Sequence, residues 1–126
     1  MPSSETIERF IARVEQNANV DAIREFYTEE ASMQENNAPK RVGRDVLIKH
    51  ECEVLSKANS VLSTCVRPVL VNGNTVVVRW IFQFEWKDGS MTRMEELAYQ
   101  RWEGERIAEE QFFYDPAQRI PSSRRG

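Results

Sequence analysis

Hydrophobic and polar positions alternate along the last third of the chain, and this pattern predicts three strands joined by tight turns. The strand from Val76 to Lys87 repeats aromatic side chains on one face: Trp80, Phe82, Phe84 and Trp86. The strands Met91–Trp102 and Arg106–Asp115 each place a matching set on one face: Met94, Glu96, Ala98 and Gln100, then Ala108, Glu110, Phe112 and Tyr114. Aromatic rings with a few convergent polar groups are what an apolar pocket requires. The alternative is an ordinary core wall with carboxylates at its edges.

The first half of the chain instead repeats apolar residues at helical spacing. Ser3 and Ser4 are candidate N-caps for a first helix with its apolar face at Ile7, Phe10, Ile11 and Val14. A second short helix is expected to begin with Asn19 as its cap and to turn inward Val20, Ile23, Phe26 and Tyr27. Residues 31–35 alternate as a short strand, and residues 36–40 are rich in turn formers.

A third helix is predicted from Arg44 to Ala58, with His50 on its apolar face beside Leu47, Val54, Leu55 and Ala58. Four strands follow from about Val61, and the Asn-Gly and Asp-Gly pairs at 72–73 and 88–89 are strong hairpin signals. Helices followed by a meander predict an α+β domain over residues 1–115, with the helices packed on one face of a mainly antiparallel sheet. Residues 116–126 are expected to form a mobile tail.

Composition narrows the class of protein. The 126 residues suffice for one core but not for two. A net charge of −3 without a basic stripe argues against a nucleic-acid partner. No apolar stretch approaches the roughly 20 residues that cross a bilayer, so no membrane association is expected. The N-terminus lacks the basic region and apolar run of a signal peptide, which favours the cytoplasm.

Cysteine and histidine usage argues against metal chemistry. Cys52 and Cys65 form no CxxC motif and lie among apolar residues, so both are expected to be buried free thiols. His50 is the single histidine, which makes a histidine-based metal site improbable. Neither a metal nor a cofactor is expected.

Four local strings, in order, resemble the SnoaL-like branch of the nuclear-transport-factor-2-like superfamily. Phe26–Met33 is similar to the junction between the second helix and first strand of that family, and Val42–Asp45 to the start of its third helix. Arg101–Ile107 and Phe113–Asp115 resemble its final hairpin. The resemblance, which extends from about residue 6 to 115, implies a curved sheet folded round the helices as a cone. Its ligand cavity would be lined by Tyr27, Met33, Leu47 and the aromatic faces, including Trp80, Phe82, Phe84 and Phe112.

The same resemblance nominates Glu35 as a catalytic residue, because ketosteroid isomerases place their general base at this position. A carboxylate at an apolar cavity mouth has a raised pKa and can move protons near neutral pH. The isomerase oxyanion donors are absent, since their positions align with Ile11 and Ala98, so steroid isomerisation is not expected. Tyr27 matches a cavity tyrosine and is expected to support packing. The alternative for Glu35 is a solvated strand end.

Glu96 and Glu110 form the second candidate site, on adjacent strands and with the parity of the cavity face. Polyketide cyclases of the family place a histidine–aspartate acid–base pair on these two strands. Two carboxylates in an apolar cavity could share a proton, which would split their pKa values into an acid and a base. The alternative is that either carboxylate forms a structural ion pair with Arg79, Arg93 or Arg106.

His50, Tyr114 and Gln100 complete the candidate set. His50 lies on the apolar face of the third helix and would be an auxiliary acid–base group, or alternatively a hydrogen-bonded core residue. Tyr114 and Gln100 could supply orienting hydrogen bonds to a ligand. Ala98 would contribute to the cavity wall.

The opposite face of the sheet also carries apolar side chains: Ile81, Leu97, Tyr99 and Phe113. Because helices cover only one face, a second copy of the sheet is the economical cover, and a homodimer is predicted.

Three functions remain open at this stage. The first is a cofactor-free isomerase, cyclase, dehydratase or hydrolase that acts on a small apolar molecule through Glu35, Glu96 and Glu110. The second is a non-catalytic module that binds such a molecule. The third is a dimeric interaction domain whose cone is plugged by its own aromatic side chains.

Overall fold

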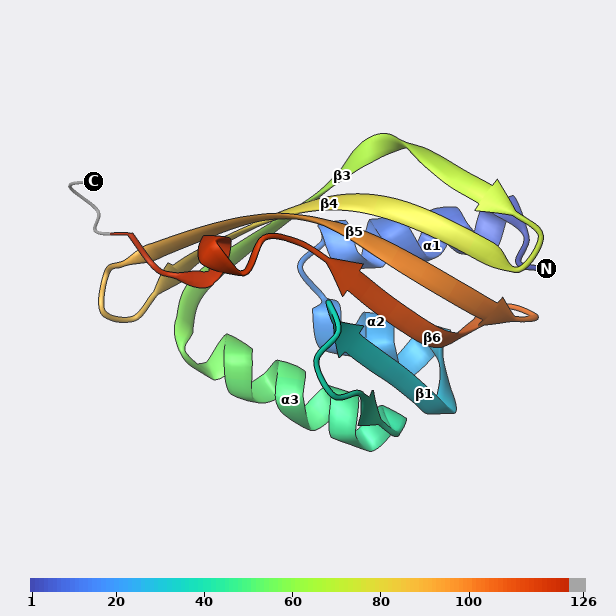
Figure 1. Ribbon diagram of the computed structural model, residues 1–126, viewed down its shortest axis with the longest axis horizontal. Helices are drawn as coiled ribbons and strands as arrows, with labels where there is room; N and C mark the ends of the chain where they lie inside the picture. The colour runs from blue at the N-terminus through green and yellow to red at the C-terminus, as the bar shows by residue number, and fades with distance from the viewer. Residues whose placement is uncertain (123–126) are drawn as a thin grey trace.

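The N-terminal half of the computed structural model, which describes residues 1–122, contains the three helices (Figure 1). They are α1 (Ser4–Glu15), α2 (Asn19–Phe26) and α3 (Arg44–Ser56). The Ser3 side chain caps α1 by accepting a hydrogen bond from the Thr6 backbone, an interaction that contributes about 1 kcal/mol. The predicted apolar face of α1 is buried. No helix among these 122 residues is both long and apolar enough to span a membrane.

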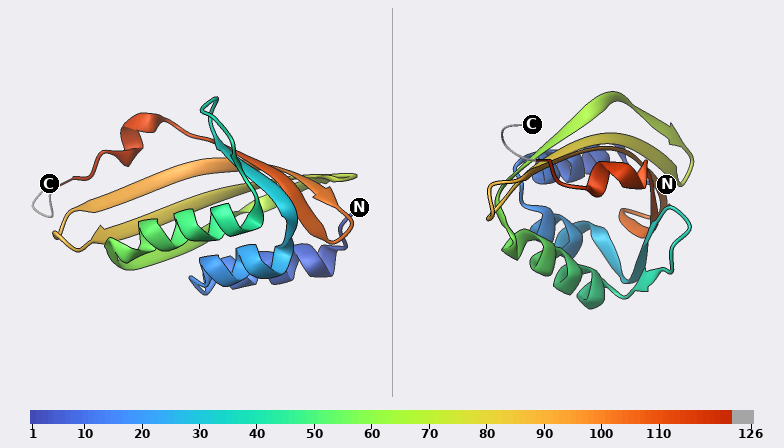
Figure 2. Two further views of the ribbon diagram at one scale, coloured as in Figure 1. Left: turned by 90° about the horizontal axis from the view of Figure 1, so that it is seen from below. Right: turned by 60° about the vertical axis from the view of Figure 1, so that its left-hand side comes forward.

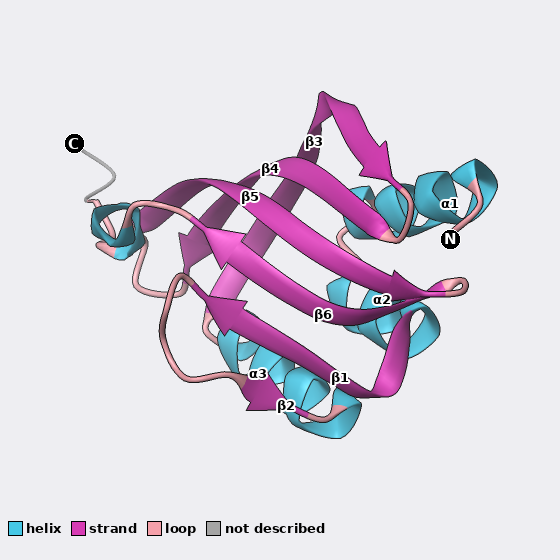
Figure 3. Cartoon of the chain, turned by 45° about the vertical axis from the view of Figure 1, so that its right-hand side comes forward, coloured by secondary structure: helices cyan, strands magenta, loops and turns pink. Residues whose placement is uncertain are grey.

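The strands form one sheet in the order β2-β1-β6-β5-β4-β3 (Figure 3). Their bounds are β1 (Tyr27–Glu35), β2 (Arg41–Val42), β3 (Ala58–Asn72), β4 (Thr75–Trp86), β5 (Met91–Glu103) and β6 (Arg106–Phe113). All neighbouring pairs are antiparallel except β1 and β6, which are parallel. The predicted α+β class, with three helices and a curved, mainly antiparallel sheet, is confirmed.

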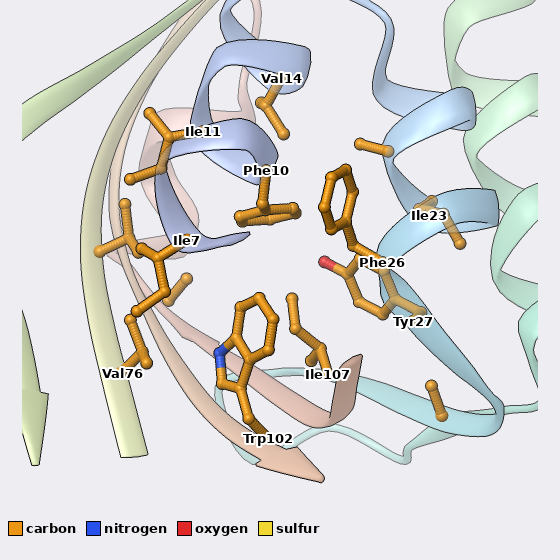
Figure 4. Packing of buried hydrophobic residues seen from close by; sticks show 14 of the residues in the cluster. Ile7, Phe10, Ile11, Val14, Ile23, Phe26, Tyr27, Val76, Trp102 and Ile107 are labelled. Atoms are coloured by element: carbon orange, nitrogen blue, oxygen red, sulfur yellow. The ribbon is translucent and has the colours of Figure 1, made fainter. Parts of the chain in front are cut away.

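The sheet curls over the helices, which lie on its concave side (Figure 2). Phe10 of α1 is at the centre of the core, next to Phe26, Tyr27 and Trp102 (Figure 4). It makes edge-to-face contacts with these three rings and with Trp80, at ring-centroid distances of 5.6 to 6.5 Å. Truncating such an aromatic residue to alanine costs about 3 to 5 kcal/mol. Phe10, Tyr27 and Trp80 belong to this core and also line the cavity of the candidate site.

Several predicted boundaries need correction. Asn19 is the first residue of α2 but not its cap, because Ala18 occupies that position and makes no side-chain hydrogen bond. The first strand begins at Tyr27 rather than residue 31, since Tyr27 already has extended backbone and pairs with Ile107. Ala58 belongs to β3, where it pairs with Trp86, so α3 ends two residues earlier than predicted.

A bulge in β6 changes which of its residues face inward. Trp102 pairs with Ile107 while Arg101 pairs with Glu109, so Ala108 has no partner in β5. The extra residue places Ile107 in the core, in the position predicted for Ala108. Beyond the bulge the predicted parity holds, and Glu110 faces inward.

The first seven residues of the predicted mobile tail are folded against the sheet. Asp115 caps a short helix, η1 (Pro116–Arg119), and the Gln118 side chain bonds both the backbone N–H and the C=O of Glu95. Ser122 pairs with Met91. These hydrogen bonds to the backbone of β5 explain why residues 116–122 are folded. Residues 123–126 lie outside the described part of the chain.

Both cysteines are free thiols, as predicted, but they are not both buried. Cys52 is exposed on α3 and Cys65 is half-buried in β3.

Candidate functional site

A cavity of about 330 Å³ lies between the helices and the concave face of β4, β5 and β6. Predicted residues that line it are Tyr27, Met33, Glu35, His50, Trp80, Phe82, Phe84, Glu96, Glu110 and Phe112. Trp80 stacks on Phe82 with ring centroids 5.5 Å apart, and Phe84 stacks on Trp86 at 4.9 Å. Leu47 is buried in the core instead of lining the cavity. The four aromatic residues of β4, Trp80, Phe82, Phe84 and Trp86, thus form one wall of the cavity, as their alternation predicted.

Glu110 lies in this cavity, 3% exposed, within a chain of buried hydrogen bonds. The Tyr27 hydroxyl donates to one carboxyl oxygen of Glu110, and Gln100 Nε2 donates to the other at 2.6 Å. Trp102 Nε1 in turn donates to Gln100 Oε1 at 3.0 Å. Burial raises the pKa of Glu110 to about 7, although both donors act in the opposite direction.

Three predicted roles around Glu110 change as a result. Tyr27 does more than pack, because burial and the nearby Glu110 charge raise its pKa and keep its hydroxyl a donor. Gln100 and Ala98 are completely buried and do not line the cavity, so neither can contact a ligand. Gln100 instead orients Glu110.

Glu96 projects into the cavity from β5, opposite Trp80 in register and 9% exposed. Burial, followed by the charges of Glu110, Glu35 and Glu51, raises the pKa of Glu96 to about 8. Within residues 1–122 its carboxyl group has no hydrogen-bond or ion-pair partner.

The arginines proposed as structural partners lie elsewhere. Arg79 and Arg93 bind Glu95, while Arg106 donates to the Tyr27 carbonyl oxygen. The ion-pair alternative for Glu96 and Glu110 is therefore wrong.

Glu96 and Glu110 lie at different levels of the sheet, and no hydrogen bond joins their carboxyl groups among the described residues. Glu110 pairs with Gln100, and the pair Ala98–Phe112 lies between that position and Glu96. Four residues of strand separate the two levels by roughly 13 Å along β5. The two carboxyl groups are thus separate titrating sites on one cavity wall that influence each other only through their charges.

The Glu35 carboxylate is ionised, and nearby arginines balance its charge. Its pKa is lowered, whereas the sequence predicted a raised pKa. Burial acts to raise its pKa, but the Tyr114 hydroxyl at 2.7 Å and Arg41 Nη2 at 2.8 Å hold the pKa below its ordinary value. Arg119 lies 3.8 Å away on η1. A carboxylate held in this way is a weak base. Tyr114 orients Glu35 and does not line the cavity.

His50 lines the cavity from α3, and burial together with the Arg41 charge lowers its pKa. It has no hydrogen-bond partner in the described part of the chain, so the core alternative for it is not supported. The adjacent Glu51, which was not among the predicted site residues, also lines the cavity. Burial raises the pKa of Glu51 against a hydrogen bond from Asn19. Its spacing from Leu47 and Val54 on one helical stripe was the signal that could have identified it.

Across residues 1–122 no group of three or more histidine, cysteine or acidic side chains is arranged to hold a metal ion.

Comparison with known proteins defines the family. Residues 7–110 match the family model of the SnoaL-like domain. The chain belongs to the SnoaL-like family. No curated protein matches this SnoaL-like chain significantly.

Solved structures agree on the fold. A proposed SnoaL-like polyketide cyclase from Mesorhizobium loti is 20% identical, with a TM-score of 0.75 over 90% of this chain and 100% of the other. IdmH, a proposed polyketide cyclase from Streptomyces antibioticus, is 17% identical, with a TM-score of 0.71 over 91% and 93% of the two chains. A protein with a ketosteroid-isomerase-like fold from Catenulispora acidiphila, in complex with trimethylamine, is 15% identical, with a TM-score of 0.75 over 92% of this chain and 89% of the other.

The SnoaL-like cavity therefore combines an aromatic wall with carboxyl groups in three different states. Glu35 is ionised and paired, Glu110 is held between two donors, and Glu96 is unpaired. Groups that titrate near neutral pH in one apolar site can both donate and accept protons there.

Proposed function

We propose that this SnoaL-like protein binds a small, mainly apolar molecule in the cavity and transfers protons on it without a cofactor. The single observation that carries the proposal is the carboxyl group of Glu96. It faces an aromatic cavity and has no partner among the described residues, and burial raises its pKa to about 8. A purely structural glutamate would be expected to be paired or solvated.

Glu96 and Glu110 would act as the proton donor and the proton acceptor, respectively. At pH 7, in the empty cavity, Glu96 is mostly protonated and can donate, whereas Glu110 is partly ionised and can accept. Tyr27 and Gln100 would keep Glu110 in one orientation. Isomerisation, cyclisation, dehydration and hydrolysis all need such a donor and acceptor at separate points of one substrate.

Hydrogen exchange on a bound molecule tests this proposal without knowledge of the substrate. Apolar carbonyl compounds that quench Trp80 and Trp86, both on the cavity wall, would be incubated with the protein in D₂O and followed by NMR. We expect deuterium to enter carbon positions of at least one ligand, and Glu96→Gln and Glu110→Gln to slow the exchange at least about a hundredfold. The matched control is Glu95→Gln, a neighbour on β5 that binds arginines outside the cavity.

Ligands that bind but never exchange, with equal rates in all variants, would instead favour the non-catalytic binding module. The hydrogen bonds that occupy both oxygens of Glu110 favour this second candidate, because they also suit a rigid binding wall. The open volume of about 330 Å³ argues against a cone plugged by its own aromatic residues.

We further propose that the protein is a homodimer through the outer face of the sheet. Leu97, Tyr99 and Phe113 are 43 to 50% exposed there, and Leu97 is paired with Phe113 in register, so the three form one patch. Large exposed apolar residues that gather in this way are typical of an interface.

A further inference from the structure

In the cavity lining, four glutamates face three lysine and arginine side chains, and two of these three lie on the single carboxylate of Glu35. Glu96, Glu110 and Glu51 line it from β5, β6 and α3. Of the basic residues in the lining, Arg41 and Arg119 lie on Glu35, and Lys57 is exposed at the end of α3. His50 has a lowered pKa and is neutral near pH 7. Among the described residues, Glu96, Glu110 and Glu51 therefore have no ion pair with a cationic side chain, although the charge of Arg119 acts on Glu96 and that of Arg41 on Glu51 from a distance.

Glu96 is the group most affected, because it is buried and faces the empty volume without a partner. The charged groups that face it are Glu110 on β6, Glu35 on β1, Glu51 on α3 and Arg119 on η1. Three of the four are acidic. A neutral, wholly apolar ligand would remove water from this carboxyl group and return nothing to it, which is costly.

The aromatic wall favours the same kind of ligand as the carboxyl groups. Trp80 lies opposite Glu96 in register and is stacked with Phe82, and Phe84 and Trp86 extend the wall. Aromatic faces, and indoles above all, attract cations, and cages of such rings bind alkylated ammonium groups. A metal ion would not use these faces, and the described residues contain no metal-binding cluster.

We infer that the natural ligand carries a positively charged nitrogen with apolar substituents, an alkylated ammonium or a protonated tertiary amine, which lies between the aromatic wall and Glu96. This inference rests on the proposed function, because it assigns the class of molecule that the cavity takes. The bound charge would stabilise ionised Glu96.

The test compares choline with its carbon isostere, in which a tert-butyl group replaces the trimethylammonium group. Both are titrated against the protein by tryptophan fluorescence at about pH 9 and about pH 6. We expect choline to bind about tenfold more tightly than the isostere at the higher pH, with the preference lost at the lower pH as the carboxyl groups protonate. Glu96→Gln should abolish the preference of the cavity for choline over the isostere, whereas Glu95→Gln should leave that preference unchanged.

Equal binding of the two probes at the higher pH, or tighter binding of the isostere, would overturn the inference and leave cavity binding intact. A preference for choline that survives Glu96→Gln would also overturn it. If neither probe binds at millimolar concentration, both this inference and the proposed binding of small molecules in the cavity fail. Circular dichroism of each variant would confirm that it is folded.

Discussion

At the residue scale, the orientation of Glu110 depends on the order of donors and acceptors behind it. The indole N–H of Trp102 can only donate, so it fixes the oxygen of the Gln100 amide and turns the NH₂ group toward Glu110. Tyr27 supplies the second donor. The carboxyl group thus receives two hydrogen bonds in a place where burial alone would keep it neutral.

We predict that Tyr27→Phe raises the pKa of Glu110 above its present value of about 7, because the variant removes a donor that favours the ionised form. The unsatisfied carboxyl oxygen should also lower the free energy of unfolding by about 1 to 3 kcal/mol. Carbon NMR of labelled glutamate side chains and urea denaturation measure the two effects. Tyr99→Phe, on the exposed outer face, is the control. A Glu110 pKa that is unchanged or lower in Tyr27→Phe would contradict the network.

Glu96 and Glu110 also predict how stability depends on pH. Their pKa values in the folded protein, about 8 and about 7, lie above the ordinary 4.5. The folded state therefore binds more protons than the unfolded state between these limits, and their contribution to stability falls as pH rises from about 5 to 8. The slope is at most about 1.4 kcal/mol per pH unit for each group.

Urea denaturation at several pH values in this window would measure that slope. Glu96→Gln should flatten it relative to the wild type and to Glu95→Gln. A slope equal in all three proteins would show that Glu96 titrates normally.

At the element scale, the alternation of apolar and polar residues correctly predicted the strands that are joined by tight turns, because such a turn fixes the register of the two strands. The period of two in β4 and β5 correctly assigned Trp80 and Glu96 to the same inner face. It failed at Ala108, because a bulge depends on how β6 meets β5 and leaves no periodic signal. The state of Glu35 was also beyond prediction, since its partner Tyr114 comes from the far end of the chain. The position of Glu51 in the cavity, by contrast, could have been predicted from helical periodicity, because Glu51 lies on the same helix face as Leu47 and Val54.

The folded segment after Asp115 gives a prediction at the same scale. A chain that ends at Asp115 loses the bonds of Gln118 and Ser122 to β5. We expect the backbone amides of Met91 and Glu95 to exchange with solvent at least about tenfold faster, because their acceptors lie in the removed segment. Hydrogen exchange by NMR measures both amides, and a chain that ends at Ser122 is the control. Unchanged protection of both amides would contradict the contacts of η1.

At the scale of the whole molecule, the two faces of one sheet carry two distinct surfaces. Its inner face carries the aromatic wall and the titrating carboxyl groups, and its outer face carries the patch formed by Leu97, Tyr99 and Phe113. Because side chains alternate along β5, Glu96 and Leu97 are neighbours in sequence yet point to opposite sides. Contact between two copies at the outer patch would therefore hold rigid the strand that positions Glu96.

Sedimentation tests the outer patch directly. At micromolar concentration we expect a species of twice the chain mass of 14.7 kDa. Leu97→Glu should produce the monomer, because it places a charge on β5 at the centre of the apolar patch. Val46→Glu, at an exposed apolar position on α3, is the matched control and should remain dimeric. Since Leu97→Glu leaves the inner face of the sheet unchanged, the monomeric variant should still bind cavity ligands. A wild-type protein that sediments only as a monomer would remove the dimer.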